Sequence, residues 1–145
     1  MTEIAFHFNV ANKLLYGCRL LRKVYSSGAS VVVTAEPALL AELDQLLWSF
    51  SATEFVPHCR LGAGEPSRGE APVLLAESLK ACAGYSILVN LGQTIPLEFE
   101  RFERLIEVVA QGEEDRLAAR SRWKHYTDRG YAMKRHDLAT AGEGA

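Results

Sequence analysis

The amino-acid sequence predicts one α/β domain built around a largely parallel β-sheet, with helices on both faces. Short apolar segments alternate with segments of helical periodicity along the 145 residues, which is the pattern of strands joined by crossover helices. Residues 30–34 and 86–91 are almost continuously apolar, as expected for strands covered on both faces. A composition of 48% hydrophobic and 23% charged residues is typical of a folded domain of this size.

The first half of the sequence contains two strand–helix pairs. Asn12 is a suitable N-cap for the first helix, and Gly28 is a suitable residue to end it. Pro37 suits the first turn of the second helix, because its missing N–H has no partner there in any case. The elements expected are a strand over residues 4–10, a helix over 12–25, a strand over 30–34 and a helix over 37–48.

The second half opens with glycines and prolines over residues 49–72, which interrupt regular structure. Within residues 54–58 we expect a short strand that ends at Pro57. The later elements expected in this half are strands over residues 73–76 and 86–91, a helix over 97–104, a strand over 105–109 and a helix over 113–128. We expect the domain to span residues 1–136. Residues 137–145 are small and polar, which indicates a flexible C-terminal tail.

A nucleotide cofactor is not expected. The first strand–helix turn, residues 9–12, has no glycine, whereas a dinucleotide fingerprint needs glycines there. Gly64 and Gly69 have the spacing of a phosphate-binding loop, but Glu70 occupies the position of its lysine and would repel phosphate. The sequence therefore predicts a sheet without a phosphate-binding loop and without a cofactor.

Metal and membrane sites are not expected either. Cys18, Cys59 and Cys82 form no C-x-x-C pair, so they are interpreted as reduced thiols rather than zinc ligands. No apolar run reaches the roughly 18 residues that span a bilayer, and the acidic N-terminus does not resemble a signal peptide. These features favour a cytoplasmic protein.

Catalytic motifs are weak. There is no G-x-S-x-G elbow, and the adjacent His58 and Cys59 point to opposite sides of an extended segment, so they do not readily share a proton. The favoured prediction is a protein that is not an enzyme. An α/β enzyme that uses His58 and Glu54 remains an alternative.

The most informative segment is the last helix. Residues three, four, seven and eight apart share one face of a helix, and this spacing links Arg120, Trp123 and Lys124 to Arg116 and links Trp123 and Lys124 to Arg120. Such a row suits an acidic peptide with a free carboxylate, because arginine binds a carboxylate with two parallel hydrogen bonds and the indole packs on the side chain. Direct binding of single-stranded nucleic acid through Arg120, Arg122 and Trp123 is the competing hypothesis, although the net charge of −2 does not favour it.

Three segments together resemble the chi subunit of bacterial DNA polymerase III. The segments are residues 43–48 (LDQLLW) followed by 55–58 (FVPH), residues 69–73 (GEAPV), and residues 120–126 (RSRWKHY) followed by 130–131 (GY). Their order and spacing match across nearly the whole chain. The combination of the LDQLLW and FVPH segments is the most specific part of this resemblance.

The resemblance implies a Rossmann-like fold without nucleotide chemistry. It also implies a non-catalytic accessory subunit of the polymerase III holoenzyme, which links the clamp loader, through the psi subunit, to the acidic C-terminal tail of the single-stranded-DNA-binding protein. Nucleic acid would then be contacted only indirectly. By the matching motif, the residues that would receive the tail are Arg116, Arg120, Trp123 and Lys124. The candidates for the psi-facing surface, which alternatively cap the core, are Trp48, Phe55, Pro57 and His58.

Overall fold

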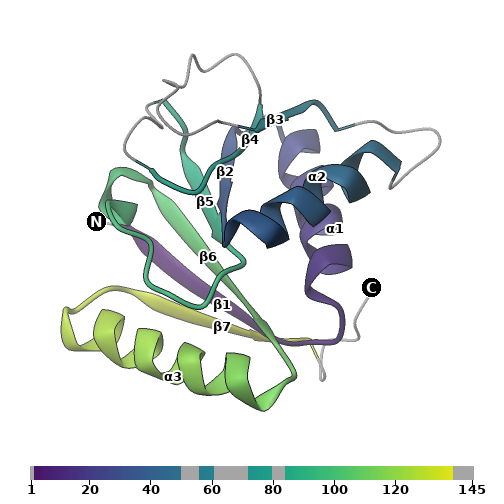
Figure 1. The fold of residues 1–145 in the computed structure, drawn as a ribbon. Coiled ribbons are helices and arrows are strands. Elements are labelled where there is room, and N and C mark those ends of the chain that lie inside the picture. The colour runs from purple at the N-terminus through teal and green to yellow at the C-terminus, as the bar shows by residue number, and fades with distance from the viewer. Residues whose placement is uncertain (1, 50–55, 61–71, 80–83, 139–145) are drawn as a thin grey trace.

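The computed structural model has a central sheet of seven parallel strands (Figure 1). It describes residues 2–49, 56–60, 72–79 and 84–138. The strands are β1 (Glu3–Val10), β2 (Val31–Thr34), β3 (His58–Arg60), β4 (Val73–Leu75), β5 (Ile87–Asn90), β6 (Arg104–Ala110) and β7 (Met133–Asp137), in the spatial order β3-β4-β2-β5-β6-β1-β7. The helices are α1 (Lys13–Ser26), α2 (Pro37–Ser49), the short 3-10 helix η1 (Phe99–Arg101) and α3 (Glu113–Asp128).

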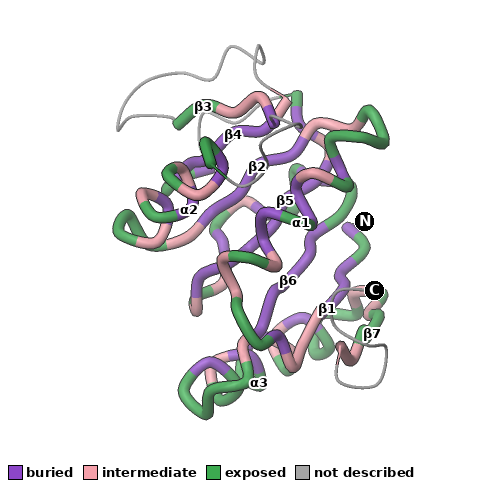
Figure 2. Tube along the Cα trace, turned by 90° about the vertical axis from the view of Figure 1, so that its right-hand side faces the viewer, coloured by how far each residue is buried: buried purple, intermediate pink, exposed green. Residues whose placement is uncertain are grey.

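Helices cover both faces of the sheet, which confirms the predicted fold class. Figure 1 shows α1 and α2 on one side and α3 on the other. Side chains alternate along β2, so Val31 and Val33 join the core under α1 and α2, whereas Val32 joins the core under α3. Because both faces are covered, the central strands are buried along their length (Figure 2), which explains their continuous apolar sequences.

The ends of α1 follow the expected chemistry. The Asn12 side chain accepts a hydrogen bond from the Leu15 amide at 3.1 Å and so caps the first turn. After the helix, Gly28 adopts a φ of 85°, a left-handed conformation that glycine tolerates without steric cost. The predicted bounds of the first two strands and helices therefore hold to within one or two residues.

The helix expected over residues 97–104 is wrong. Only Phe99–Arg101 is helical, as one 3-10 turn, and Arg104 already begins β6. Glu98 precedes the turn with a left-handed φ of 71°, and Phe102 follows it with extended backbone. Phe99 and Phe102 are both buried in the core under α3, so a single turn is enough to bury both rings.

The strand expected to end at Pro57 instead begins after it, at His58. Proline has no N–H for a ladder hydrogen bond, so it precedes β3 rather than lying inside it. Residues 54–55 lie outside the described residues. β3 is the edge strand beside β4.

The sequence did not predict β7, which forms the opposite edge of the sheet. It pairs in parallel with β1, and Phe6 lies opposite Arg135. Asp137 belongs to this strand, and Leu138 packs against the core under α1 and α2. Residues 139–145 lie outside the described residues. In the described segments, no helix is long and apolar enough to span a membrane.

Candidate binding groove between α3 and the sheet

A groove of about 370 Å³ runs between α3 and the β7 edge of the sheet. Three of the four predicted tail-binding residues line it: Arg116, Arg120 and Trp123. The helix that carries them has the predicted bounds, Glu113–Asp128. The remaining lining residues come from the inner face of α3 and from three strands: Ala119, Phe6, Phe8, Val109 and Arg135.

The groove has an aromatic floor. The Phe6 and Trp123 rings meet edge to face, with centroids 5.2 Å apart, a favourable geometry for aromatic pairs. The guanidinium of Arg135 lies over the Phe8 ring at 5.1 Å and over the Trp123 ring at 5.8 Å. The half-buried indole thus belongs to the α3-side core on one face and to the groove on the other.

The rim of the groove is cationic. Arg116, Arg120 and Arg135 are exposed, and none of the three forms an ion pair with a carboxylate in the part of the chain that the structure describes. Three guanidinium groups beside an apolar floor make a site for an anionic ligand with a hydrophobic side chain. Two of these arginines, Arg116 and Arg120, belong to the predicted helical row, and Arg135 is a third that the row did not include.

Lys124 does not line the groove. Its ammonium is exposed and lies 3.1 Å from the Asp128 carboxylate, one turn further along α3. A surface pair of this kind is weak, so the lysine is available to a ligand that extends past Trp123.

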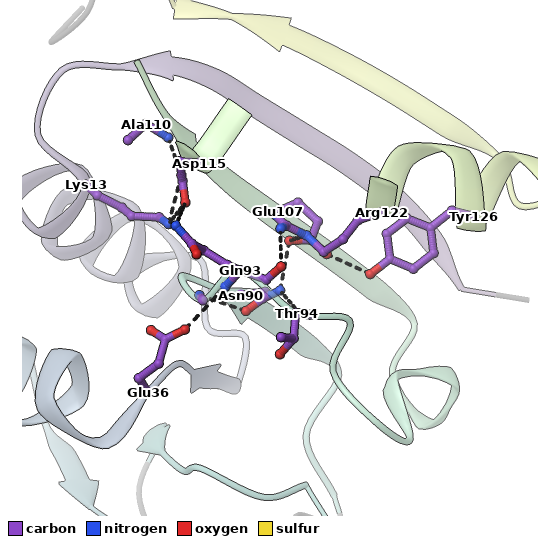
Figure 3. Close-up of polar contacts among 11 residues, drawn as sticks. Lys13, Glu36, Asn90, Gln93, Thr94, Glu107, Ala110, Asp115, Arg122 and Tyr126 are labelled. Atoms are coloured by element: carbon purple, nitrogen blue, oxygen red, sulfur yellow. Dashed lines mark hydrogen bonds and ion pairs between the residues drawn. The ribbon is translucent and has the colours of Figure 1, made fainter. Parts of the chain in front are cut away.

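Arg122 is buried, which corrects its placement on an accessible face. Only 2% of the residue is exposed, and its Nε donates to Glu107 Oε1 at 3.1 Å (Figure 3). Its Nη1 donates to the Gln93 carbonyl at 2.7 Å. A direct nucleic-acid surface built on Arg120, Arg122 and Trp123 therefore loses one of its three members.

Glu107 is the acceptor at the centre of this buried network. It is fully buried, and it also accepts hydrogen bonds from the Tyr126 hydroxyl at 2.6 Å and the Asn90 amide at 2.9 Å. Burial raises the pKa of Glu107, and these donors with the Arg122 guanidinium oppose the rise. Because Arg122 and Tyr126 are on α3 and Glu107 is on β6, the network fixes the helix against the sheet.

A second polar anchor holds the first turn of α3. The Asp115 carboxylate accepts hydrogen bonds from the Ala110 amide at 2.7 Å, from Lys13 Nζ at 3.0 Å and from Gln93 Nε2 at 3.1 Å (Figure 3). Burial by itself raises the pKa of Asp115, but these donors outweigh burial and hold the pKa below its ordinary value. The groove-lining Arg116 directly follows this anchor.

The candidate residues for a psi-facing surface lie far along the sheet, at the β3 edge. Trp48 is 63% exposed at the end of α2 and meets the His58 ring edge to face at 5.1 Å. His58 in turn bridges the Asp44 carboxylate at 3.0 Å and the Val56 carbonyl at 2.8 Å. Pro57 is half-buried beside them, and Phe55 lies outside the described residues. Trp48 is thus a surface residue and does not cap the core.

The alternative hypothesis, an enzyme that uses His58 and Glu54, is only partly covered by the described residues. Glu54 lies outside the described residues, and the described contacts of His58 are structural. A hollow of about 530 Å³ does lie at the carboxyl ends of the strands, with Glu36 and Glu77 in its wall, but none of its described lining residues is histidine, cysteine, lysine or arginine. In the described segments, no group of three or more acidic, histidine or cysteine side chains is arranged to hold a metal ion.

Five groove residues were not predicted from the sequence: Phe6, Phe8, Val109, Ala119 and Arg135. The two phenylalanines belong to the first predicted strand, where alternation places them on one face. Nothing in the sequence indicated that Arg135 lies in a strand, because Met133–Asp137 is almost entirely polar. This segment also pairs with β1, which lies more than a hundred residues earlier in the sequence.

Comparison with known proteins agrees with the resemblance in the sequence. The family model of the DNA polymerase III chi subunit, HolC, matches residues 1–134. The DNA polymerase III subunit chi of Pseudomonas aeruginosa is 32% identical over 143 residues, covering 95% of this chain and 98% of that protein. The Escherichia coli K12 subunit chi is 31% identical over 118 residues, covering 80% and 79% respectively.

A further similarity concerns the fold alone. A structure of the C-terminal domain of the DEAD-box protein Dbp5 aligns with a TM-score of 0.57 and 16% identity, covering 96% of this chain and 91% of that one. This likeness concerns the arrangement of strands and helices and carries no statement about function.

Proposed function

The chain belongs to the family of DNA polymerase III chi subunits, and from this premise we propose that it is an accessory subunit. In this proposal, the subunit uses the groove beside α3 to bind the acidic C-terminal tail of the single-stranded-DNA-binding protein. Its second partner in this proposal is the psi subunit, through which it would join the clamp loader. The protein would then act as an adaptor, without a catalytic step of its own.

One observation carries the tail-binding proposal: three exposed arginines surround an aromatic floor in a single groove. An acidic peptide that ends in proline and phenylalanine has the complementary features. Its carboxylates suit the arginines, and its last ring suits the floor of Phe6, Phe8 and Trp123.

A nucleic-acid backbone suits the groove less well. Binding to phosphates alone needs a long cationic track, whereas the groove has three arginines and the whole chain has a net charge of −2. Base stacking on successive nucleotides needs several exposed aromatic faces, and Trp123 is the groove's one aromatic side chain on α3 and is only half-exposed.

The psi-facing proposal depends on the β3 edge. Trp48 is a large aromatic residue left 63% exposed, and His58 and Asp44 fix its neighbourhood. Exposed tryptophans held by a rigid surround are typical anchors of protein interfaces. The distance of this edge from β7 along the sheet would let the two partners bind at the same time.

Calorimetry with a synthetic acidic peptide ending in Pro-Phe tests the tail-binding proposal. We expect micromolar affinity that weakens with added salt, and Arg120→Ala should cost about 1–3 kcal/mol of binding free energy, as for a lost charge-assisted hydrogen bond. Arg129→Ala is the matched control, because it removes an exposed arginine at the end of α3 that does not line the groove. Equal affinities for the native chain and the Arg120 variant would exclude the groove as the binding site.

The psi-facing proposal has a separate test. Trp48→Ala should weaken capture of purified psi while leaving peptide binding unchanged, and Leu97→Ala, which also removes an exposed apolar side chain, serves as the control. Undiminished psi binding by the Trp48 variant would exclude this edge as the psi surface.

A further inference from the structure

Arg135 is the groove residue that the helical row did not contain. It is the middle residue of the edge strand β7 and lies opposite Phe6 on β1. Neighbouring residues of a strand point to opposite faces, so Arg135 points to the α3 side whereas Lys134 and His136 point away. His136 accordingly meets His7, with ring centroids 4.7 Å apart.

The guanidinium of Arg135 is held in place by aromatic rings. It lies over Phe8 at 5.1 Å and over Trp123 at 5.8 Å. By contrast, Arg116 and Arg120 have no ion-pair or ring partner among the described residues. A guanidinium that already lies against aromatic rings loses less rotamer freedom when it binds an anion.

The position of Arg135 also places any anion that it binds beside the aromatic floor of the groove. An anion that Arg135 binds must lie close to the rings of Phe8 and Trp123, because the guanidinium lies over both rings. A C-terminal residue with a large apolar side chain meets both demands at once, since its α-carboxylate and its side chain leave the same Cα atom. An acidic residue within a peptide carries its carboxylate at the end of its side chain, so it offers no large apolar side chain on the same residue.

Building on the proposed function, we propose that Arg135 is the receptor for the free α-carboxylate of the bound tail, and that it makes the groove specific for a chain end whose last residue is aromatic or large and aliphatic. Arg116 and Arg120, one turn apart on α3, then receive acidic side chains further upstream. The groove thereby reads the polarity of the peptide, with its end at the β7 edge.

A cycle that combines a variant with a modified peptide tests this assignment. The free-acid and C-terminally amidated forms of one acidic peptide ending in Pro-Phe are titrated into the native chain and into Arg135→Ala. Amidation should weaken binding to the native chain by roughly tenfold, the effect of losing one charge-assisted hydrogen bond. In the Arg135 variant, amidation should change the affinity by less than about twofold.

Two further variants control the cycle. Lys134→Ala removes a neighbouring cation that points to the other face and is 69% exposed, so it should retain the full effect of amidation. Arg135→Lys keeps the charge but loses the planar fork, and it should show an intermediate effect. Equal thermal midpoints for the native chain and the variants would verify that the edge strand is intact.

The outcomes separate this inference from the function on which it rests. If neither peptide binds the native chain, the tail-binding proposal fails. If the free peptide binds and amidation weakens the native chain and Arg135→Ala equally, the tail-binding proposal stands and the carboxylate assignment to Arg135 is overturned. If amidation has its effect in the native chain and in Lys134→Ala but not in Arg135→Ala, the assignment is established.

Discussion

Replacing Arg122 with methionine should disrupt the element that holds α3, and with it the groove, against the sheet. Methionine fills much of the same volume but leaves Glu107, which is fully buried, without its guanidinium partner. The carboxylate keeps two hydrogen bonds, from Asn90 at 2.9 Å and Tyr126 at 2.6 Å. The Gln93 carbonyl, which accepts from Arg122 at 2.7 Å, loses that donor.

The expected cost of Arg122→Met is about 3–5 kcal/mol of unfolding free energy at neutral pH, the range for removing one partner of a buried ion pair. Urea unfolding followed by circular dichroism measures it, with Arg129→Met, an exposed arginine of the same region, as the control. The loss should shrink at acid pH. Burial already raises the pKa of Glu107, and without Arg122 the protonated carboxyl becomes still more favoured in the folded state.

A second substitution in the same network separates the ion pair from simple packing. Glu107→Gln combined with Arg122→Met removes both charges. The single amide oxygen of glutamine can still accept from Asn90, and its NH2 group can donate to the Tyr126 hydroxyl oxygen. This double variant should regain most of the lost stability, because replacing both partners of a buried pair costs far less than removing one. A cost below about 1 kcal/mol for Arg122→Met alone, as for an exposed pair, would refute the reasoning.

Two pH-dependent effects should accompany these changes. Asp115→Asn should lower the unfolding free energy by about 1–3 kcal/mol at pH 7. Because hydrogen-bond donors hold the folded-state pKa of Asp115 below its ordinary 3.8, this difference should persist down to about pH 3.8 and vanish as the pH falls through the folded-state pKa. Urea titrations at pH 7 and pH 3 measure the difference, and a cost that does not change with pH would contradict this prediction. Burial lowers the pKa of His7 from 6.5 to about 4, so the unfolding free energy of the native chain should decrease as the pH falls from 6.5 towards 4. His7→Gln should weaken this dependence of the unfolding free energy on pH. An unchanged pH dependence in the variant would contradict the prediction.

The central strands and the long helices could be predicted from the sequence because their signals are local. Residues 30–34 are β-branched throughout their centre, and both sides of the strand that they form are buried in the core. Asn12 caps α1 through a hydrogen bond from the amide of Leu15, only three residues away. The 3-10 turn at Phe99–Arg101 was mistaken for a helix because two phenylalanines three residues apart satisfy either structure.

The candidate site could be predicted only in part, because a groove has two walls. The α3 wall follows from helical spacing, whereas the other wall requires the pairing of β7 with β1. An edge strand with the sequence MKRHD has no apolar alternation to identify it. The burial of Arg122 did leave a trace in the sequence: Glu107 interrupts an apolar strand, and a buried carboxylate needs a cationic or hydrogen-bonding partner.

The most direct test of the groove uses the two tryptophans of the chain, since one lies at each proposed surface. Their indole N–H signals can be followed by nitrogen-15 NMR while an acidic peptide ending in Pro-Phe is added. The proposal predicts that the Trp123 signal shifts with saturation while the Trp48 signal remains in place. A titration in which Trp48 shifts and Trp123 does not would contradict the assignment of the tail to the groove beside α3.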